Sequence, residues 1–240
     1  MVKVDVSHRM LEHFIGKRLT RDELEELLFT LGYELENVDG DLWTVDITAD
    51  RPDLISAAGL GRLLKAYLGI APGLPNYTVK KSDYHILINP NVQHIRPYTV
   101  AAVVKGLQLT EDSLKELIRI QEKLHATFGR QRKKVAIGIY PLDNIAWPIS
   151  YFAEDPKKVK FVPLDFDRTL RADEILEQHP TGATYKHLLQ DAQQYPFFMD
   201  AKKQILSMPP IINAQHLGKV TSHTKDVFIE CSGHDFHAQN

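Results

Sequence analysis

The chain has 240 residues, of which 43% are hydrophobic and 25% charged, so it can form one sizeable core or two smaller ones. Its formal net charge is −2, and a nucleic-acid partner would therefore have to be met by a local basic patch. The chain has no apolar run of the roughly 20 residues that a membrane helix needs, no apolar signal core at residues 1–5 and a single cysteine, Cys231, which excludes an internal disulfide. We expect a cytoplasmic protein.

The first 75 residues predict a small α+β module. Residues 2–6 alternate between apolar and polar side chains, as in a strand, and Ser7 is a suitable N-cap for the helix that follows. Residues 20–23 have the capping-box pattern that opens a second helix. Asp39-Gly40 predicts a hairpin turn, and a third helix is expected over 56–68.

A domain boundary is predicted at Pro72-Gly73-Leu74-Pro75-Asn76, because proline and glycine punctuate the chain there. We therefore expect a structural module over residues 1–75 and a larger domain over 79–240.

Strands and helices alternate irregularly through the second part. Strands are predicted over residues 84–88, 98–105, 135–140, 149–153, 160–163, 197–200, 204–208 and 226–232, and helices over 111–128 and 172–178, with a further turn at 185–189. Because many of the strand pairings must be non-local, the domain is expected to be a mixed α/β or α+β sheet, and the fold class of the chain is expected to be α+β or mixed α/β.

A Pro209-Pro210 pair follows the strand predicted over 204–208. Neither ring leaves a backbone N–H for the sheet, so the chain is expected to leave the sheet there. Asn213 is placed to bond backbone groups of that turn.

The strand predicted over 226–232 has two distinct faces, because successive side chains alternate. One is expected to be a core face: Val227, Ile229 and Cys231. The other carries an aromatic ring, a carboxylate and a hydroxyl: Phe228, Glu230 and Ser232. This second face is either a small polar and aromatic pocket or a solvated face with one stray phenylalanine.

Four positive charges lie in five residues between a predicted helix and a strand: Arg130, Arg132, Lys133 and Lys134. Such a run can neutralise phosphates of a nucleic acid. It can equally be a solvated loop whose charges complement the C-terminus of the helix.

Several common catalytic motifs are missing from the sequence. It contains no P-loop, no Gly-x-Ser-x-Gly elbow and no His-Glu-x-x-His helix. Cys231, His234 and His237 are spaced like possible zinc ligands, but the two histidines follow the last strand while the thiol is expected to face the core, so no metal site is predicted.

The motifs that remain point to a family. Residues 206–213 and 227–233, with residues 51–54, 96–98 and 135–138 in the same order, closely resemble phenylalanyl-tRNA synthetase β subunits of the archaeal and eukaryotic type, including their editing domain. The resemblance covers essentially the whole chain. It implies hydrolysis of the ester that joins a wrong amino acid, tyrosine, to the 3′ end of phenylalanine tRNA.

The resemblance also implies roles for individual residues. Glu230 would accept the phenol hydrogen of a tyrosyl group, and Ser207 and Ser232 would position substrate or water. The remaining pocket residues would be Phe198, Phe228 and Asn213, with Phe198 at a wall position that is usually leucine in archaeal relatives.

The same resemblance implies a tRNA acceptor end and a synthetase α subunit as partners, and tRNA contact by the basic run. Editing needs no cofactor, while ATP and magnesium would belong to a synthetic part that this sequence does not show. The chain ends soon after the last motif, so either a fragment or a freestanding editor is expected. The alternative is a non-catalytic tRNA-binding or subunit-docking module with a vestigial pocket.

Overall fold

The computed structural model describes residues 2–48 and 50–239. The chain forms two compact units, one of residues 1–80 with 112–123 and one of residues 81–111 with 124–240. The division after residue 80 follows the proline- and glycine-rich segment 72–76, and it adds 112–123 to the first unit. The domain limits 1–75 and 79–240 stay a prediction.

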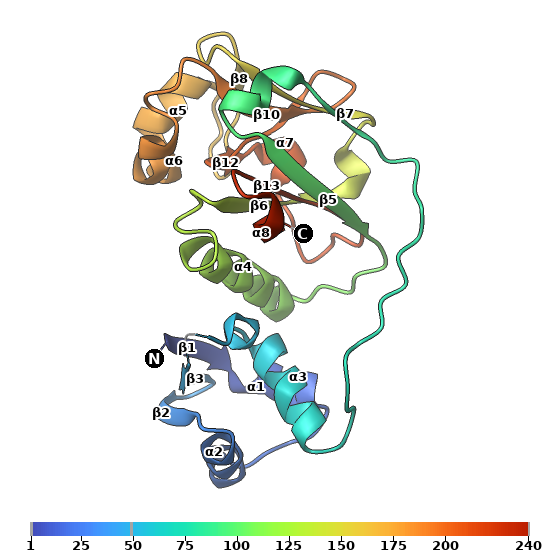
Figure 1. Cartoon of the computed structure of the whole chain (residues 1–240), viewed down its shortest axis with the longest axis vertical. Coiled ribbons are helices and arrows are strands. Elements are labelled where there is room, and N and C mark those ends of the chain that lie inside the picture. The colour runs from blue at the N-terminus through green and yellow to red at the C-terminus, as the bar shows by residue number, and fades with distance from the viewer. Residues whose placement is uncertain (1, 49, 240) are drawn as a thin grey trace. The chain divides into compact units, whose positions relative to one another are not determined.

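The first unit contains a three-stranded antiparallel sheet in the order β1-β3-β2 (Figure 1). Its strands and helices are β1 (Val2–Ser7), α1 (His8–Ile15), α2 (Arg21–Thr30), β2 (Glu34–Asp39), β3 (Leu42–Ile47), the short 3-10 helix η1 (Pro52–Leu54) and α3 (Ala57–Tyr67). The predicted caps are confirmed: Ser7 accepts a hydrogen bond from the Met10 N–H, and Thr20 and Glu23 form a capping box. The predicted hairpin is confirmed by the pairing of Asp39 with Leu42.

Two glycines in α3 allow close packing. A Cβ atom on Gly59 would lie 1.8 Å from the Asp53 carbonyl oxygen, and one on Gly61 would lie 2.6 Å from Phe14 Cβ. No larger residue fits at either position without moving the backbone or helix α1.

The second unit contains two larger sheets and a small one (Figure 1). The five-stranded sheet has the order β12-β11-β10-β7-β4, with β4 parallel to β7 and the other pairs antiparallel. The three-stranded antiparallel sheet has the order β5-β13-β6, and β8 pairs with β9. The strands are β4 (Ile86–Ile88), β5 (Tyr98–Val104), β6 (Val135–Pro141), β7 (Ile149–Glu154), β8 (Lys160–Phe161), β9 (Leu170–Arg171), β10 (Tyr195–Met199), β11 (Ile205–Met208), β12 (Ile212–Asn213) and β13 (Val227–Gly233). The mixed α+β prediction is confirmed.

Helices and 3-10 turns complete the described part of the chain: η2 (Pro90–His94), α4 (Glu111–Ala126), η3 (Leu142–Asn144), α5 (Ala172–Gln178), α6 (Pro180–Tyr185), η4 (Lys186–Leu188), α7 (Gln215–Gly218) and α8 (Phe236–Gln239). Helix α6 was not predicted, because Pro180 and Gly182 are typical of turns. Here Pro180 takes the first helical position, where the missing N–H costs nothing. Among the described residues, no helix combines the length and apolar composition needed to cross a membrane.

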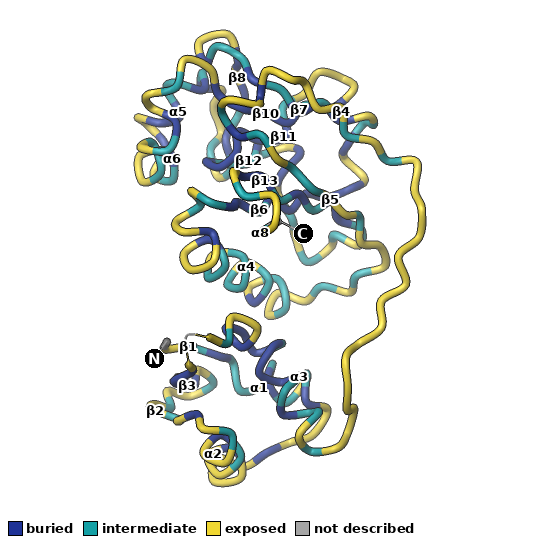
Figure 2. The backbone as a smooth tube through the Cα atoms, viewed as in Figure 1, coloured by how far each residue is buried: buried dark blue, intermediate teal, exposed yellow. Residues whose placement is uncertain are grey.

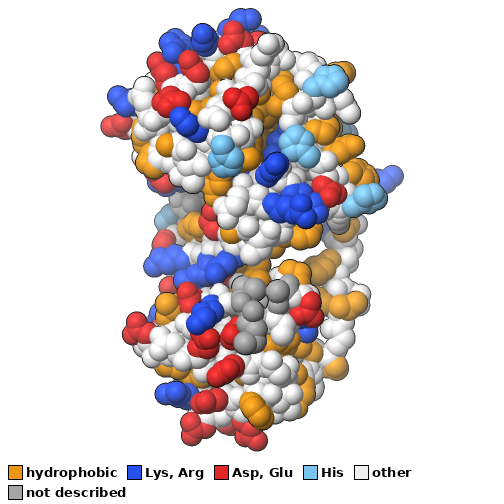
Figure 3. Space-filling model, turned by 60° about the vertical axis from the view of Figure 1, so that its left-hand side comes forward, with side chains coloured by type: hydrophobic (Ala, Val, Ile, Leu, Met, Phe, Trp, Pro, Cys, Tyr) orange, Lys and Arg blue, Asp and Glu red, His pale blue; other side chains and the backbone are white. Residues whose placement is uncertain are grey.

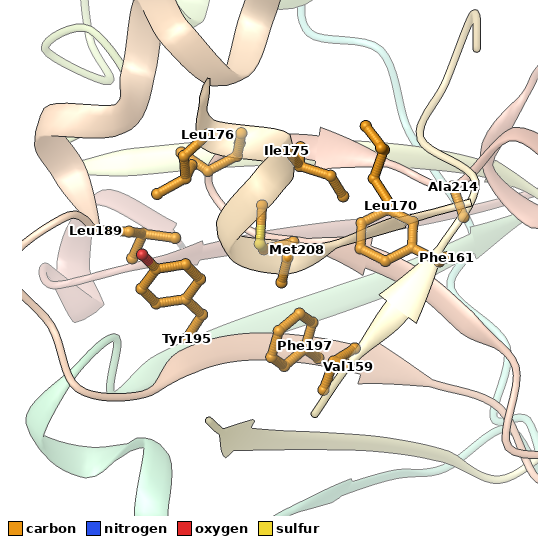
Figure 4. Close-up of a cluster of buried hydrophobic side chains, with 12 residues drawn as sticks. Val159, Phe161, Leu170, Ile175, Leu176, Leu189, Tyr195, Phe197, Met208 and Ala214 are labelled. Atoms are coloured by element: carbon orange, nitrogen blue, oxygen red, sulfur yellow. The ribbon is translucent and has the colours of Figure 1, made fainter. Parts of the chain in front are cut away.

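Strand β10 divides the core of the second unit. Phe197 and Phe198 are adjacent and therefore point to opposite faces of the five-stranded sheet. Phe197 joins the cluster drawn in Figure 4, where it lies with Met208 and Tyr195 beneath the side chains of α5. Phe198 joins a second cluster with Tyr140 and Phe228 of the three-stranded sheet. The two sheets therefore pack face to face, and Figure 2 shows the buried strands there in dark blue.

The chain leaves β11 at Pro209-Pro210, as predicted, and returns at once, with Ile212 paired to Met208. The predicted hydrogen-bond partners of the Asn213 side chain were wrong. Its amide donates to the carbonyls of Ile139, at 3.3 Å, and Gly218, at 3.4 Å, rather than to the Pro-Pro turn. Asn213 thus links β12 to β6.

Candidate functional site

The polar face of β13 points into the protein. Glu230 is 2% exposed and Ser232 is fully buried, as is Phe228 near the start of the strand. Of the three residues predicted to form a core face on the opposite side, Val227 is buried, while Ile229 and Cys231 are half-buried. That prediction is confirmed for Val227 but not for Ile229 and Cys231, because the five-stranded sheet packs on the face that carries the carboxylate and the hydroxyl.

Glu230 and Ser207 meet at a tyrosine. The Tyr140 hydroxyl donates to Glu230 Oε1 at 3.2 Å and forms a second hydrogen bond with Ser207 Oγ at 2.8 Å. A phenol has one hydrogen, so Tyr140 accepts from Ser207 when it donates to Glu230. Three side chains from β6, β11 and β13 thus form one buried chain of hydrogen bonds.

A glycine makes room for this contact. Gly138 lies directly opposite Glu230 in the pairing of β6 with β13. A Cβ atom at this position would lie 2.3 Å from the Tyr140 hydroxyl oxygen and 2.5 Å from Glu230 Oε1. The Tyr140 ring therefore lies back over Gly138, and the phenol fills the space that a side chain there would take.

Ser232 is held by a buried arginine. Arg96 is 2% exposed, and its Nε donates to Ser232 Oγ at 3.1 Å while its Nη2 donates to the Ser232 carbonyl. The same nitrogen donates to the Arg132 carbonyl at 3.3 Å. The Arg96 carbonyl accepts from the Tyr151 hydroxyl at 2.8 Å, so the residue is fixed at both ends.

Burial dominates the electrostatics of the cluster. It raises the pKa of Glu230 to about 7, against the positive charge of Arg96 and the hydroxyls of Tyr140 and Ser232, which favour the carboxylate. Burial also lowers the pKa of Arg96 to about 10 and raises the pKa of Tyr140 well above its usual range. Glu230 Oε2 is buried with no hydrogen-bond partner among the described residues, so the carboxylate keeps one acceptor unused.

Aromatic rings surround these polar groups. Phe198 stacks on Tyr151 with a centroid distance of 4.4 Å, and Phe228 lies 5.4 Å from the rings of both Tyr140 and Trp147. Phe198 and Phe228, the two phenylalanines predicted as pocket residues, thus lie in one apolar cluster.

The structure brings together the pocket residues predicted from the sequence. Ser207 and Glu230 meet through Tyr140, and Asn213 pairs with Ser207 across β11 and β12. No role was predicted for Tyr140 or Gly138, although both lie on one face of a predicted strand. Arg96 belonged to a recognised motif but had no predicted role. An isolated arginine in a sequence gives no sign that it will be buried.

The basic run is divided between structure and surface. Arg130 and Lys133 are exposed. Arg132 donates to the Ile211 carbonyl at 2.9 Å, and its guanidinium lies over the Tyr185 ring at 4.2 Å. Lys134 pairs with Asp235 at 3.1 Å. Residues 130–132 have φ values of 48°, 55° and 64°, a left-handed conformation that non-glycine residues rarely adopt. The contacts of the Arg132 side chain stabilise this conformation of the loop.

Two other features lie apart from the cluster. A pocket of about 330 Å³ opens beside β4, with Leu87, Ile88, Ser150 and Met199 in its lining, and none of the predicted site residues lines it. Within residues 2–48 and 50–239, no three His, Cys, Asp or Glu side chains are grouped to hold a metal ion. On the face drawn in Figure 3, basic and acidic side chains are interspersed.

Comparison with known proteins gives consistent results. The family model described as the Phe-tRNA synthetase β subunit B1 domain matches residues 1–70. Phenylalanine–tRNA ligase β subunits of Pyrococcus horikoshii and Thermococcus gammatolerans are 45% and 44% identical over 97% and 98% of the chain. The chain spans only 43% and 42% of those two proteins.

A solved structure shares the whole fold. The crystal structure of an N-terminal fragment of the phenylalanyl-tRNA synthetase β subunit from Pyrococcus horikoshii superposes with a TM-score of 0.93 at 43% identity, over 99% of this chain and 70% of the fragment. The chain therefore belongs to the phenylalanyl-tRNA synthetase β-subunit family.

Proposed function

We propose that the second unit hydrolyses tyrosine mischarged onto phenylalanine tRNA. The observation that carries the proposal is the convergence of Ser207, Glu230 and Ser232 in one buried cluster. Each was assigned an editing role from the sequence alone. Ser207 comes from β11, whereas Glu230 and Ser232 lie two residues apart on β13.

The chemistry of the cluster suits selection of a phenol. An apolar synthetic pocket rejects an added hydroxyl by only about 10²-fold, whereas a site built to bond that hydroxyl can discriminate by about 10⁴–10⁵. A buried carboxylate beside a hydroxyl is such a site. Phenylalanine would leave Glu230 and Ser207 without partners, which costs free energy in a buried environment.

Hydrolysis would proceed by a positioned water, without a covalent intermediate. The aminoacyl ester is already labile, so orientation and hydrogen bonding of the developing oxyanion suffice. Ser207 has Tyr140 and no histidine as its described partner, which leaves its hydroxyl a weak nucleophile. Burial and the nearby Glu230 raise the pKa of the Cys231 thiol to about 12, so it is not a thiolate at neutral pH.

In this proposal the chain acts on the acceptor end of the tRNA in the cytoplasm, together with a synthetase α subunit. Arg130 and Lys133 would supply phosphate contacts, because they are the exposed members of the basic run. The chain would not form aminoacyl-adenylate, and editing would need no cofactor.

The test is deacylation by the purified chain. Tyr-tRNA(Phe) should lose its amino acid at a rate well above the spontaneous one, while Phe-tRNA(Phe) should stay charged. A rate equal to the spontaneous one for both substrates contradicts the proposal, provided that circular dichroism shows that the same preparation is folded.

One observation favours a second candidate, a tRNA-binding or subunit-docking module without activity. Glu230, Ser207 and Tyr140 are all buried, so the cluster has no open mouth in this conformation. The docking module predicts that Tyr-tRNA(Phe) and Phe-tRNA(Phe) bind equally and that neither is hydrolysed.

A further inference from the structure

The polar groups assigned to the substrate already have a phenol bound to them. Tyr140 is fully buried, and its hydroxyl reaches both Glu230 Oε1, at 3.2 Å, and Ser207 Oγ, at 2.8 Å. These are the acceptor and the hydroxyl that a tyrosyl substrate would need. Figure 2 shows the strands that carry them, β6, β11 and β13, as buried.

A second phenol cannot join the first one without a rearrangement. The Tyr140 oxygen lies against the backbone of Gly138, where even a methyl group would overlap it at 2.3 Å. The other carboxylate oxygen, Glu230 Oε2, is enclosed as well. Among the described side chains around Glu230 and Ser207, only Tyr140 bonds both, so its departure would release both groups together.

We propose that Tyr140 is a specificity-determining residue that occupies the Glu230 and Ser207 site in the empty enzyme and is displaced by the tyrosyl group of the substrate. The inference rests on the proposed editing function. Exchange of one phenol for another keeps both hydrogen bonds, so tyrosine binds without loss. Phenylalanine would displace Tyr140 and leave both polar groups unpaired, which is unfavourable.

The internal phenol also explains how the empty site tolerates its own burial. A buried carboxylate with no partner is costly, and the Tyr140 hydroxyl supplies a hydrogen-bond donor while no substrate is present. Discrimination then arises from the difference between displacement of Tyr140 by tyrosine and displacement of Tyr140 by phenylalanine. The loss of the Tyr140 hydrogen bonds contributes equally to both.

This scheme makes a distinctive prediction for Tyr140→Phe. The variant ring no longer competes for Glu230 and Ser207, so tyrosinamide should bind at least about tenfold more tightly, the effect of one hydrogen bond of ordinary strength or more. Phenylalaninamide should tighten by the same factor, because it no longer breaks any bond. The ratio of the two dissociation constants should stay unchanged.

Isothermal titration calorimetry with the two amides measures these constants directly. The matched control is Tyr195→Phe, since Tyr195 is also a buried tyrosine of the second unit but lies in the cluster on the other face of the five-stranded sheet (Figure 4). It should change neither constant. A crystal structure of the wild-type chain with tyrosinamide should show the ligand phenol at Glu230 and the Tyr140 ring moved away.

Each alternative gives a different result. If Tyr140 positions Glu230 for the substrate, Tyr140→Phe weakens tyrosinamide binding and lowers the preference over phenylalaninamide. If Tyr140 only supports the fold, both constants stay the same. Either result overturns the inference and leaves editing intact when the wild-type chain still deacylates Tyr-tRNA(Phe). A wild-type chain that neither deacylates Tyr-tRNA(Phe) nor binds tyrosinamide contradicts the proposed function and the inference together.

Discussion

The Arg96 guanidinium donates to Ser232 Oγ at 3.1 Å, although 136 positions separate the two residues. The same side chain donates to the carbonyls of Ser232 and Arg132. One buried cation therefore ties the end of β13 to the basic loop that precedes β6. Its charge also favours the ionised form of Glu230.

Removing Arg96 should destabilise the second unit strongly. Arg96→Ala leaves the Ser232 and Arg132 groups unpaired and should lower the free energy of unfolding by about 3–5 kcal/mol, as does breaking a buried charged network. Urea denaturation followed by Trp147 fluorescence measures this, in a Trp43→Phe background that silences the first unit. Arg168→Ala, which removes an exposed arginine bonded to Gln178, should change the value by at most about 0.5 kcal/mol. Equal effects of the two variants would refute the structural role of Arg96.

Glu230→Ala should reduce discrimination between Tyr-tRNA(Phe) and Phe-tRNA(Phe). The variant removes the acceptor proposed for the substrate phenol, and a hydrogen bond to a charged group is worth about 1.5–3 kcal/mol, or about ten- to a hundredfold. The ratio of kcat/KM for the two charged tRNAs measures it. A variant that keeps the full preference for Tyr-tRNA(Phe) would show that Glu230 is not the acceptor.

The ionisation of Glu230 should make stability depend on pH. Because burial raises the pKa of Glu230 from its ordinary value near 4.5 to about 7, the folded state holds the proton more tightly than the unfolded state. Its stabilising effect is complete below about pH 4.5 and is lost as the pH rises through about 7. Arg96, Tyr140 and Tyr151 face the same carboxylate, and the shifted pKa of each lies above this window.

Glu230→Gln removes this titration and keeps the shape of the side chain. Relative to wild type, the variant should gain on the order of 3 kcal/mol of unfolding free energy between pH 4.5 and pH 8. Urea denaturation across this range, again with Trp147 as the probe, gives the difference. A difference that does not vary with pH would mean that Glu230 titrates normally in the folded protein.

Features that depend on neighbouring residues could be predicted from the sequence, and features that depend on distant residues could not. The caps at Ser7 and Thr20, the turn at Asp39-Gly40 and the exit at Pro209-Pro210 depend on neighbouring residues, and each was predicted correctly. The inner face of β13 was assigned to the wrong side, because alternation separates two faces without showing which one another sheet covers. The polar face of β13 is covered by Phe198 and Leu206 of the five-stranded sheet.

The pocket could be predicted only in part for the same reason. Glu230 and Ser232 stood out as polar groups on one face of a predicted strand, and Ser207 was assigned through the resemblance to the family. Tyr140 looked like an ordinary strand residue, and its role depends on a contact across 90 positions. A local sequence pattern carries no information about a contact between residues so far apart.

The basic run should separate into two functions. Replacing Arg130 and Lys133 with alanine should weaken tRNA binding and reduce the salt slope by up to about two, one for each phosphate that is no longer neutralised. The fold should be unaffected, because both side chains are exposed. Filter binding or fluorescence anisotropy across a salt series measures the slope. An unchanged slope would mean that Arg130 and Lys133 are solvated side chains that neutralise no phosphate.

Arg132→Ala provides the contrast within the same run. Arg132 bonds the Ile211 carbonyl and packs on Tyr185, so its removal should lower the unfolding free energy by about 1–3 kcal/mol. The Arg130 and Lys133 variant should bind tRNA more weakly with unchanged stability. Arg132→Ala should mainly lose stability. This pair of results would separate phosphate binding from support of the loop.

The proposed hydrolysis should need neither a thiol nor a metal ion. Cys231 is on the face of β13 opposite Glu230 and Ser232, and its raised pKa keeps it protonated at neutral pH. Cys231→Ala should therefore keep most of the deacylation rate, and any decrease should follow the change in stability, because the side chain is half-buried. Ethylenediaminetetraacetate should leave the rate of the wild-type chain unchanged when the tRNA is kept folded with monovalent salt. An acyl-enzyme trapped on Cys231 or Ser207, or a rate abolished by the chelator and restored by a metal ion, would replace the positioned-water mechanism with covalent or metal-assisted hydrolysis.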